Sequence, residues 1–347
     1  MERGALVGRG GAVRFIRIIA WALVIGHVPV WIFAITATPF LPLPAAQRVA
    51  IATASAAVAE VMFWGGGAIL GAAAIAKFRR PKVTTGRSFA GKRVAVLGAT
   101  GGLGAAIAHA LKREGAEVVA LARDTTRLAD GLRDGALQVD ITSPGSLEDV
   151  AGHLGAIDTL VCATGMDVRK DLRAHSAEEI AAEVEVNLVG PVLATRALVH
   201  LVGDGGTIAI LGGFADGRLA LPYHSVDVAS RAGVAAFCES MNRELPLEGR
   251  DVRLCYVCPA PADTEGERPY GELWRSMGSP PVPPQRIADF VLAALVRRQR
   301  VAVMGRSNRL MAWINKVSPG AADVLGIRRA GRRLRDAFSS TRSGPTP

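Results

Sequence analysis

Two long apolar runs stand at the start of the chain. The first covers residues 18–37, IIAWALVIGHVPVWIFAITA, and His27 is its only titratable side chain. The second covers residues 49–76, with Glu60 as its only charge. A helix of about 20 apolar residues crosses the roughly 30 Å of bilayer hydrocarbon, and the proline-rich segment TPFLPLPAAQR between the runs breaks a helix. The pattern predicts a transmembrane α-helical hairpin that forms a membrane anchor, residues 1–82.

Basic side chains flank the outer ends of this hairpin. Four arginines precede the first run, and two lysines and two arginines follow the second, whereas the connecting loop holds only Arg48. Segments rich in Lys and Arg stay on the cytoplasmic side of a membrane. We therefore expect a two-pass protein of the cell inner membrane whose following domain lies in the cytoplasm. The alternative is a signal peptide, which predicts a shorter apolar region and no second span.

Two ionisable residues fall within the predicted spans. His27 and Glu60 lie at similar distances from the middle of the loop, and therefore at similar depth in an antiparallel hairpin. Ionisable groups inside a membrane pair with one another or face the interior of a bundle. We predict that His27 and Glu60 lie on facing sides of the two helices, either to hold them together or to serve a proton or ligand. Gly67 and Gly71 form a small-xxx-small step that permits close helix contact.

A different pattern begins at Lys92, where short apolar runs alternate with amphipathic stretches. The strand-like runs are KRVAVLG, EVVALAR, ALQVD, DTLVCATG, GTIAILGG, DVRLCYVCP and RVAVMG, and helices are expected over 105–115, 146–154, 176–202, 226–245 and 285–297. Alternation of this kind is typical of a parallel sheet covered on both faces. For residues 83–305 we therefore predict an α/β fold, a Rossmann-type doubly wound parallel sheet.

A glycine-rich turn, GATGGLG at residues 98–104, joins the first of these strands to the first helix. Glycines at such a turn let the backbone approach a pyrophosphate, which then lies at the positive end of the helix dipole. The order strand, glycine turn and helix within about 30 residues is the context in which dinucleotides bind.

Composition and charge narrow the classes of function. Half of the 347 residues are apolar and only four are cysteines, which excludes a disordered or disulfide-stapled chain. The net charge of +10 is uneven, since residues 1–82 carry +7, residues 297–347 carry +10 and the middle carries −7. An acidic core with basic ends argues against a nucleic acid partner. Cys255 and Cys258 fall on one strand and are expected in the core, and the histidines lack metal-ligand spacing, so no metal site is predicted.

Several motifs resemble the short-chain dehydrogenase/reductase family over about residues 90–305. The resemblance implies an oxidoreductase with a nicotinamide cofactor in a Rossmann domain. The residues that match the family's cofactor-binding motifs are Gly98, Thr100, Gly102, Leu103 and Gly104 in the glycine turn, Asp140 and Ile141 after the third strand, Gly165 in LVCATG, and Pro259 and Thr264 in VCPAPADT. The chain departs from the family at Ala260, where glycine is usual, and at residues 162–164, which replace an Asn-Asn-Ala sequence.

The end of the second strand indicates which nicotinamide cofactor is used. Family members that use NAD carry an Asp there for the ribose hydroxyls, whereas this chain has Ala122 followed by Arg123. A guanidinium group suits a 2′-phosphate, so the resemblance implies NADP(H) rather than NAD(H). The alternative is that Arg123 only pairs with a surface acid such as Asp124.

The resemblance breaks down at the catalytic positions. The family uses a Ser, a Tyr and a Lys four residues after the Tyr, and alignment of DVASRAGVAAFCESMNREL without gaps places Gly213, Asp227 and Arg231 there. Of the family's four catalytic residues, only Asn187 is retained. Arg231 is expected to lower the pKa of Asp227, one helical turn before it, and is also a candidate contact for the cofactor ribose. Tyr223 is a second candidate proton donor.

The last segment, residues 306–347, alternates apolar and basic residues. Leu310, Met311, Trp313 and Ile314 are expected on one face, with the arginines of residues 328–335 on another. This pattern predicts a basic amphipathic tail on an anionic membrane surface. A solvated basic helix or a disordered end is the alternative, and disorder is expected for the final nine residues.

Two functions of different class follow from these motifs. One is a membrane-anchored oxidoreductase that transfers hydride to or from a lipophilic carbonyl or alcohol with NADP(H). The other is a non-catalytic NADP(H)-binding relative that serves as a sensor or scaffold at the membrane. Only the first needs a proton donor near the nicotinamide. The resemblance also implies a homo-oligomer that pairs through the helices near 176–202 and 226–245.

Overall fold

A computed structural model describes residues 4–78, 88–213 and 219–339 of the chain. The chain divides into two compact units, Met1–Thr84 and Thr85–Pro347. Each unit is described by itself below, since the two are not placed relative to one another.

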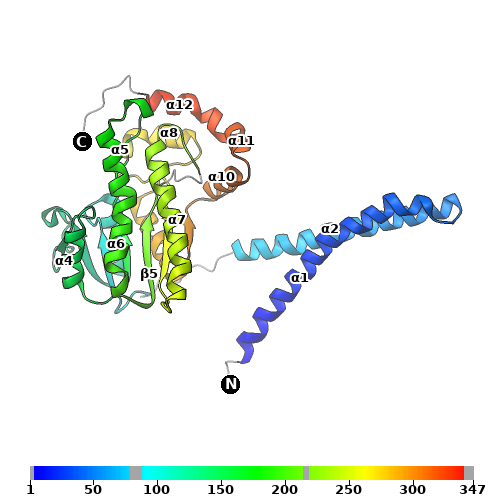
Figure 1. Ribbon diagram of the computed structural model, residues 1–347, viewed down its shortest axis with the longest axis horizontal. Coiled ribbons are helices and arrows are strands. Elements are labelled where there is room, and N and C mark those ends of the chain that lie inside the picture. Colours follow the sequence, from blue (N-terminus) through cyan, green and yellow to red (C-terminus); the bar gives the residue numbers. More distant parts are fainter. Residues whose placement is uncertain (1–3, 79–87, 214–218, 340–347) are drawn as a thin grey trace. The chain divides into compact units, whose positions relative to one another are not determined.

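The first unit is a pair of long helices (Figure 1). Helix α1 covers Gly4–Ile32 and continues through a π-helical turn, Phe33–Ala37, and a 3-10 turn, Thr38–Phe40. Helix α2 covers Ala45–Phe78. By length and composition, Ile18–Phe40 and Ala45–Ile69 are candidate membrane spans. Both predicted runs therefore form helices that are long and apolar enough to cross a bilayer.

Small residues bring α1 and α2 together. Ala20 and Ala59 are fully buried, and a Cβ on Gly66 would lie 2.8 Å from the Ala20 carbonyl oxygen. Close approach of this kind lets backbones pack without bulky side chains between them. Gly67, by contrast, has nothing within 4 Å of its Cβ position, so the contact lies at Gly66 and not at Gly67. The surroundings of Gly71, the other residue of the predicted step, lie outside what the structure describes.

His27 and Glu60 do not pair as predicted. The His27 ring packs on the Phe63 ring of α2, with centroids 5.0 Å apart, and its Nδ1 contacts the Val24 carbonyl oxygen. The exposed Glu60 carboxylate accepts a 2.8 Å hydrogen bond from Trp64 Nε1 on its own helix. His27 therefore faces α2 as predicted, whereas Glu60, one residue of helical rotation from the buried Ala59, is exposed. Each of the two side chains hydrogen-bonds within its own helix and not to the other.

The second unit contains one parallel sheet of seven strands. The strands are β1 Arg93–Leu97, β2 Glu117–Ala122, β3 Leu137–Gln138, β4 Ile157–Cys162, β5 Val202–Leu211, β6 Arg253–Cys258 and β7 Val301–Val303. Their order in the sheet is β3-β2-β1-β4-β5-β6-β7. The order reverses between β1 and β4, which places a crevice for a ligand at the carboxyl ends of these strands. The predicted doubly wound parallel sheet is confirmed.

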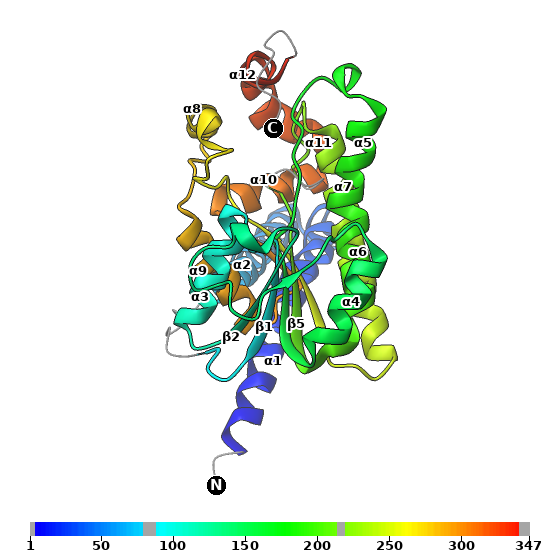
Figure 2. The same cartoon turned by 90° about the vertical axis from the view of Figure 1, so that its left-hand side faces the viewer.

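Helices cover both faces of this sheet (Figure 2). Helices α3 (Gly102–Arg113) and α9 (Pro284–Val296) share one buried cluster with alternate strand residues such as Val94 and Val96. Helices α4 (Pro144–Leu154), α6 (Gly190–Leu198) and α7 (Ser225–Leu247) share the other cluster, with Ala95 and Leu97. Successive side chains of a strand point to opposite faces, so both faces are apolar, as is typical of parallel sheets.

Helix α5, Ala177–Val184, leads through a π-helical turn, Glu185–Val189, into α6. This stretch is also long and apolar enough, by length and composition, to be a candidate span over Ala177–Leu201. Its residues Ala194 and Leu198 are buried in the cluster beneath the sheet, so its apolar face packs in the core of the second unit. The four cysteines, Cys162, Cys238, Cys255 and Cys258, are buried thiols, and Cys255 and Cys258 lie in the core as expected.

The chain after β7 returns over the carboxyl ends of the strands (Figures 1 and 2). Its helices are α10 (Arg306–Val317), α11 (Pro319–Ala322) and α12 (Arg328–Phe338), and they lie at the same end as α8 (Gly271–Ser276). Helix α12 buries Ala330, Leu334 and Phe338 in a third cluster with Leu219, Leu221 and Trp274. The apolar face of α12 therefore packs on its own domain and not on a membrane, and only its arginine face is open. The end of the tail, residues 340–347, lies outside the described residues.

Candidate active site

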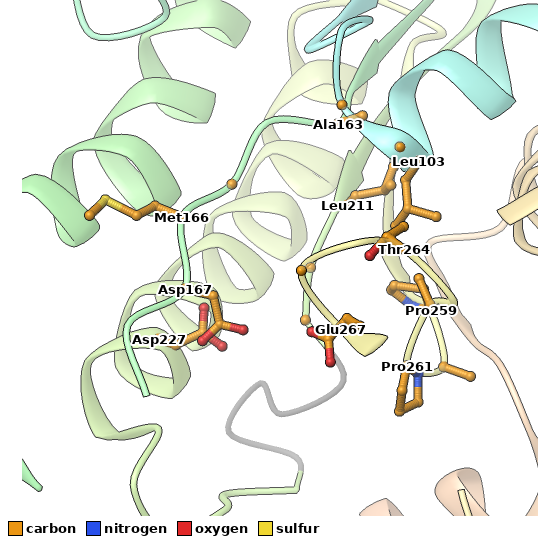
Figure 3. A pocket seen from close by; sticks show the side chains of 18 of the residues that line it. Leu103, Ala163, Met166, Asp167, Leu211, Asp227, Pro259, Pro261, Thr264 and Glu267 are labelled. Atoms are coloured by element: carbon orange, nitrogen blue, oxygen red, sulfur yellow. The ribbon is translucent and has the colours of Figure 1, made fainter. Parts of the chain in front are cut away.

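A cavity of about 690 Å³ opens at the carboxyl ends of β1, β4, β5 and β6. Figure 3 shows the Asp167 and Asp227 carboxyl groups side by side at one wall, with Glu267 on a loop opposite. The residues that line it come from six segments: Gly101, Gly102 and Leu103; Ala163 to Asp167 and Arg169; Leu211 to Gly213; His224, Asp227 and Arg231; Pro259 to Ala262; and Thr264 to Glu267, Tyr270 and Trp274. Several of the sequence-predicted site residues thus meet in one place.

The glycine turn forms the floor beside α3. Gly98 has a φ of +80°, which favours glycine, and a Cβ on Gly104 would lie 2.1 Å from the Gly98 carbonyl oxygen. The turn is therefore closed tightly against the first turn of α3, and Gly101, Gly102 and Leu103 line the cavity. The first backbone N–H groups of a helix have no partner within it and attract anions. This part of the site fits a pyrophosphate.

Residues predicted to hold the adenosine half lie at the ends of β2 and β3. Arg123 follows β2 and is exposed, while Asp140 follows β3 and accepts hydrogen bonds from the Thr142 N–H and hydroxyl at 2.9 and 2.7 Å. These bonds lower the pKa of Asp140, and the nearby charge of Arg123 lowers it further. Ile141 is buried against Gly190, so its side chain belongs to the core and leaves only its backbone for a ligand.

The remaining predicted cofactor residues line the cavity between the glycine turn and α7. A Cβ on Gly102 would lie 2.8 Å from Thr264 Cγ2, and one on Gly165 would lie 3.0 Å from Arg231 Nη2. Pro259 and Ala260 form the wall after β6. Glycine at 102 and 165 thus lets Thr264 and Arg231 pack directly against the backbone, where a Cβ would displace them. Together with Pro259 and Ala260, these residues border the part of the cavity that is available to a nicotinamide.

Asp227, Arg231 and Asn187 form one hydrogen-bonded group at the far wall. Asp227 Oδ1 accepts from Arg231 Nε at 2.6 Å and from Asn187 Nδ2 at 3.2 Å. The Asn187 amide also holds both backbone groups of Met166, donating to its oxygen at 2.6 Å and accepting from its nitrogen at 2.8 Å. Asn187 therefore fixes the strand end after β4 against α7. Gly213 lies beside this group and offers no hydroxyl.

The pKa of Asp227 shifts in the direction opposite to the sequence-based expectation. Burial raises the pKa of the Asp227 carboxyl to about 6, against the opposing effect of the Arg231 guanidinium, and Asp167 adds to the rise. The Asp227 side chain is only 4% exposed. Because desolvation disfavours the charged carboxylate, one close guanidinium does not restore an ordinary pKa.

Tyr223, the second candidate donor, lies outside the cavity lining. It packs against the third cluster, beside Leu219 and Leu221, with a φ of +67°. Its neighbour His224 lines the cavity instead and is buried against the Trp274 and Phe338 rings. Burial lowers the pKa of His224, which favours the neutral imidazole.

Sequence reasoning missed a second set of charged residues in this wall. Arg169 pairs with both Asp167 and Glu267, and its guanidinium lies 5.2 Å from the Tyr270 ring and 5.7 Å from the Trp274 ring. Glu183 is fully buried behind them. For Glu183 the sequence did hold one signal. It stands four residues before Asn187 and so lies on the same helical face. The other charged residues, Asp167, Arg169 and Glu267, lie in loops whose course is set by tertiary contacts.

Comparisons with known proteins agree with this geometry. Residues 92–272 match the family described as short chain dehydrogenase. The ketoacyl reductase HetN of Nostoc sp. is 25% identical over 281 residues, covering 73% of this chain and 97% of that protein. The 3-dehydrosphinganine reductase TSC10B of Arabidopsis thaliana is 26% identical over 188 residues, covering 50% of this chain and 56% of that protein.

A solved structure gives the same result. A short chain dehydrogenase from Burkholderia cenocepacia, solved in complex with NADP, superposes with a TM-score of 0.59 at 29% identity. The match covers 69% of this chain and 98% of that one. The family match spans the cavity residues from the glycine turn to Tyr270. This chain therefore belongs to the short chain dehydrogenase family.

Proposed function

We propose that this protein is a membrane-anchored, NADP(H)-dependent oxidoreductase that acts on a carbonyl or alcohol group of a lipophilic substrate, with Asp227 as its proton donor. The observation that carries the proposal is the Asp227 carboxyl group. It faces the cavity beside the residues that fit a nicotinamide, and burial raises its pKa to about 6. A general acid works best when its pKa is near the working pH.

The cofactor is held by residues that follow four strands, β1, β2, β4 and β6, and by Arg231 on α7. The glycine turn and the start of α3 bind the pyrophosphate, Arg123 binds the 2′-phosphate, and Thr264, Gly165 and Arg231 border the nicotinamide. The bound NADP of the Burkholderia cenocepacia relative supports this choice. When bound, NADPH supplies the hydride for the carbonyl carbon. The chain's own residues place the substrate and hold the proton for its oxygen.

The substrate is lipophilic because the cavity and the anchor both suit one. Met166, Leu211, Tyr270 and Trp274 line the cavity with apolar and aromatic surface. The names of two relatives, a ketoacyl reductase and a 3-dehydrosphinganine reductase, support a ketone as the reacting group. The two candidate spans support a protein of the cell inner membrane, and their basic flanks favour the cytoplasmic side for the family domain.

Part of the C-terminal segment also suits a membrane surface. On α10 and the turn after α11, five apolar side chains are more than half exposed: Leu310, Trp313, Val317, Val324 and Leu325. Arg306 and Lys316 are exposed on α10, and Arg328 is exposed at the start of α12. Apolar side chains bordered by cations suit the interface of an anionic bilayer. We therefore assign the predicted contact with the membrane to this surface and not to the packed face of α12.

A second candidate function is a non-catalytic NADP(H) sensor or scaffold at the membrane. The Asp227–Arg231 ion pair favours it, since the two groups also satisfy one another as a structural pair. In that case NADPH binds but is not oxidised.

The test uses the full chain in detergent micelles, with NADPH and a series of long-chain ketones. We expect oxidation of NADPH by the wild type, and a loss of about 10² to 10⁴ in rate for Asp227→Asn with NADPH affinity retained. Asp149→Asn, an exposed change on α4, is the matched control. Loss of the rate with Tyr223→Phe instead would move the donor to Tyr223. Binding of NADPH without oxidation by any ketone would favour the sensor.

A further inference from the structure

Glu183 is a fully buried acid that the proposed chemistry does not yet use. It lies on α5, one turn before Asn187, with 0% of its surface exposed. Its Oε1 accepts a 3.1 Å hydrogen bond from the Val168 N–H. Its Oε2 is buried and has no hydrogen-bond partner among the described residues. An unpaired carboxylate oxygen in this position is costly, because desolvation is not offset by any donor.

The Glu183 carboxyl group belongs to a cluster of three acids. Carboxylate oxygens of Glu183, Asp167 and Asp227 all lie within 4.8 Å of one another. Asp167 uses Oδ2 to bind Arg169, at 2.7 Å from Nε, and Asp227 uses Oδ1 to bind Arg231 at 2.6 Å. Glu183 has the Val168 N–H as its donor and no guanidinium. It is therefore the member of the cluster with the least compensation for a negative charge.

The charges around the cluster do not balance. The charged and titratable groups that face it are Asp167 and Arg169 after β4, Glu183 on α5, His224, Asp227 and Arg231 at the start of α7, and Glu267 on the loop after β6. Among the residues that the structure describes, four carboxyl groups thus face two guanidinium groups. Either protons or a cation must offset the excess. A proton is favoured, because Arg169 and Arg231 already repel a divalent cation from the oxygens of Asp167 and Asp227.

We propose that Glu183 carries a proton at neutral pH, shares it with Asp227, and resupplies Asp227 after that residue has given its proton to the substrate. This inference rests on the proposed function for its last step. Asp227 lines the cavity and Glu183 does not, so Asp227 is the catalytic residue and Glu183 is a positioning residue for the proton. One bridging water spans a separation of this size.

The proton transfers balance as follows. In carbonyl reduction, the O–H bond of Asp227 breaks as the substrate oxygen gains that proton and its carbon gains the hydride supplied by NADPH. The Asp227 carboxylate then takes the Glu183 proton, and the Glu183 carboxylate takes up one proton from a hydronium ion or buffer acid of the solvent, which is the proton that the overall reduction consumes. The reprotonation of Glu183 is favourable because its Oε2 is buried and has no donor among the described residues, so the charged carboxylate has the higher free energy.

A measurement on the unmodified protein tests the proton itself. Infrared spectra of the full chain in detergent micelles are recorded from pH 5 to 9 to follow the carbonyl stretch of protonated carboxyl groups. Burial raises the pKa of Glu183 to about 7, so a band is expected at pH 6 that is lost as the pH rises through about 7. Absence of any such band above pH 5.5 would overturn the proposal. Because this test uses the wild-type protein, it does not depend on whether a variant folds.

Variants then assign the band and connect it to the reaction. Glu183→Gln is expected to remove one band component and to lower the kcat of ketone reduction by about 10²-fold with KM unchanged. Glu183→Asp is expected to restore part of the rate and of its pH profile. Glu178→Gln, an exposed change on the same helix, is expected to alter neither. A band and a pH profile that survive Glu183→Gln would contradict the proposal.

The remaining outcomes are also decisive. If magnesium or manganese chloride raises the unfolding temperature of the wild type but not of Glu183→Gln, the cluster is a cation site and the shared proton is refuted. If the wild type oxidises no NADPH but retains a Glu183-dependent band, the proposed function and the delivery step are wrong, whereas the shared proton stands.

Discussion

Asp227 and Arg231, one turn apart at the start of α7, form the buried charged pair of the cavity wall. Arg231 Nε donates to Asp227 Oδ1 at 2.6 Å, and the two side chains are 4% and 11% exposed. In the family that this chain resembles, a tyrosine and a lysine are expected at these positions. Under the proposed function, Asp227 takes the place of the phenol as the proton donor and Arg231 takes the place of the lysine as the cation.

Removal of the cation is expected to destabilise the fold. In Arg231→Met the Asp227 carboxylate is left buried and without its guanidinium, a change that costs about 3–5 kcal/mol. The loss should be smaller at pH 5, where Asp227 takes up a proton. Urea unfolding of the two proteins at pH 5 and pH 8 measures both effects. Arg243→Met removes an exposed pair on the same helix and should cost at most about 1 kcal/mol.

The stability of the wild type is expected to fall as the pH rises from about 4.5 to about 7. Burial raises the pKa of Glu183 from its ordinary 4.5 to about 7, and that of Asp227 from 3.8 to about 6. In this range the folded chain binds more protons than the unfolded chain, so the free energy of unfolding decreases with pH. The double variant Glu183→Gln, Asp227→Asn should flatten the decrease. An equally steep curve in both proteins would show that other groups cause it.

A methyl group at position 104 is expected to disrupt the glycine turn. The Cβ of Gly104→Ala would lie 2.1 Å from the Gly98 carbonyl oxygen, so the turn must open at a cost of about 1–3 kcal/mol or more. The affinity for NADPH should fall because the opened glycine turn no longer fits the pyrophosphate. The fluorescence of bound NADPH measures this affinity. Gly152→Ala, a helical position on α4 with nothing within 4 Å of its Cβ, should leave the affinity unchanged.

Arg123 is expected to select the phosphorylated cofactor. In Arg123→Ala the affinity for NADPH should fall roughly 10- to 100-fold, the effect of losing a charge-assisted contact. The affinity for NADH should change little, since it has no 2′-phosphate. Titration with both cofactors gives the ratio. An equal loss of affinity for NADH and NADPH would mean that Arg123 supports the fold of the loop and does not bind the 2′-phosphate.

Helix α12 is expected to be part of the stable domain. Leu334 is fully buried in the third cluster, so Leu334→Ala should cost about 2–5 kcal/mol. It should also expose α12 to proteolysis, which limited digestion detects. Leu325→Ala changes a side chain that is 54% exposed and should alter stability by less than about 0.5 kcal/mol. Equal effects of the two variants would contradict the packing of α12.

Much of the second unit could be predicted from local pattern. The strands β1 to β7 and the helices α3, α4, α6, α7 and α9 lie where periodicity placed them. The glycine turn was recognisable because a strand, three glycines and a helix follow one another without interruption. By contrast, the partners of His27 and Glu60 could not be predicted from their depth, because one residue of helical rotation decides whether a side chain meets the neighbouring helix.

The sequence by itself determined the two apolar helices, the doubly wound sheet and the glycine turn, since each depends on residues close together in the chain. Only the tertiary structure decided the chemistry of the cavity wall. It buried Asp227 deeply enough to raise its pKa despite Arg231, brought Glu183 and Asp167 beside it, and packed the apolar face of α12 inward. Desolvation and charge proximity depend on segments far apart in the chain, and no local pattern records them.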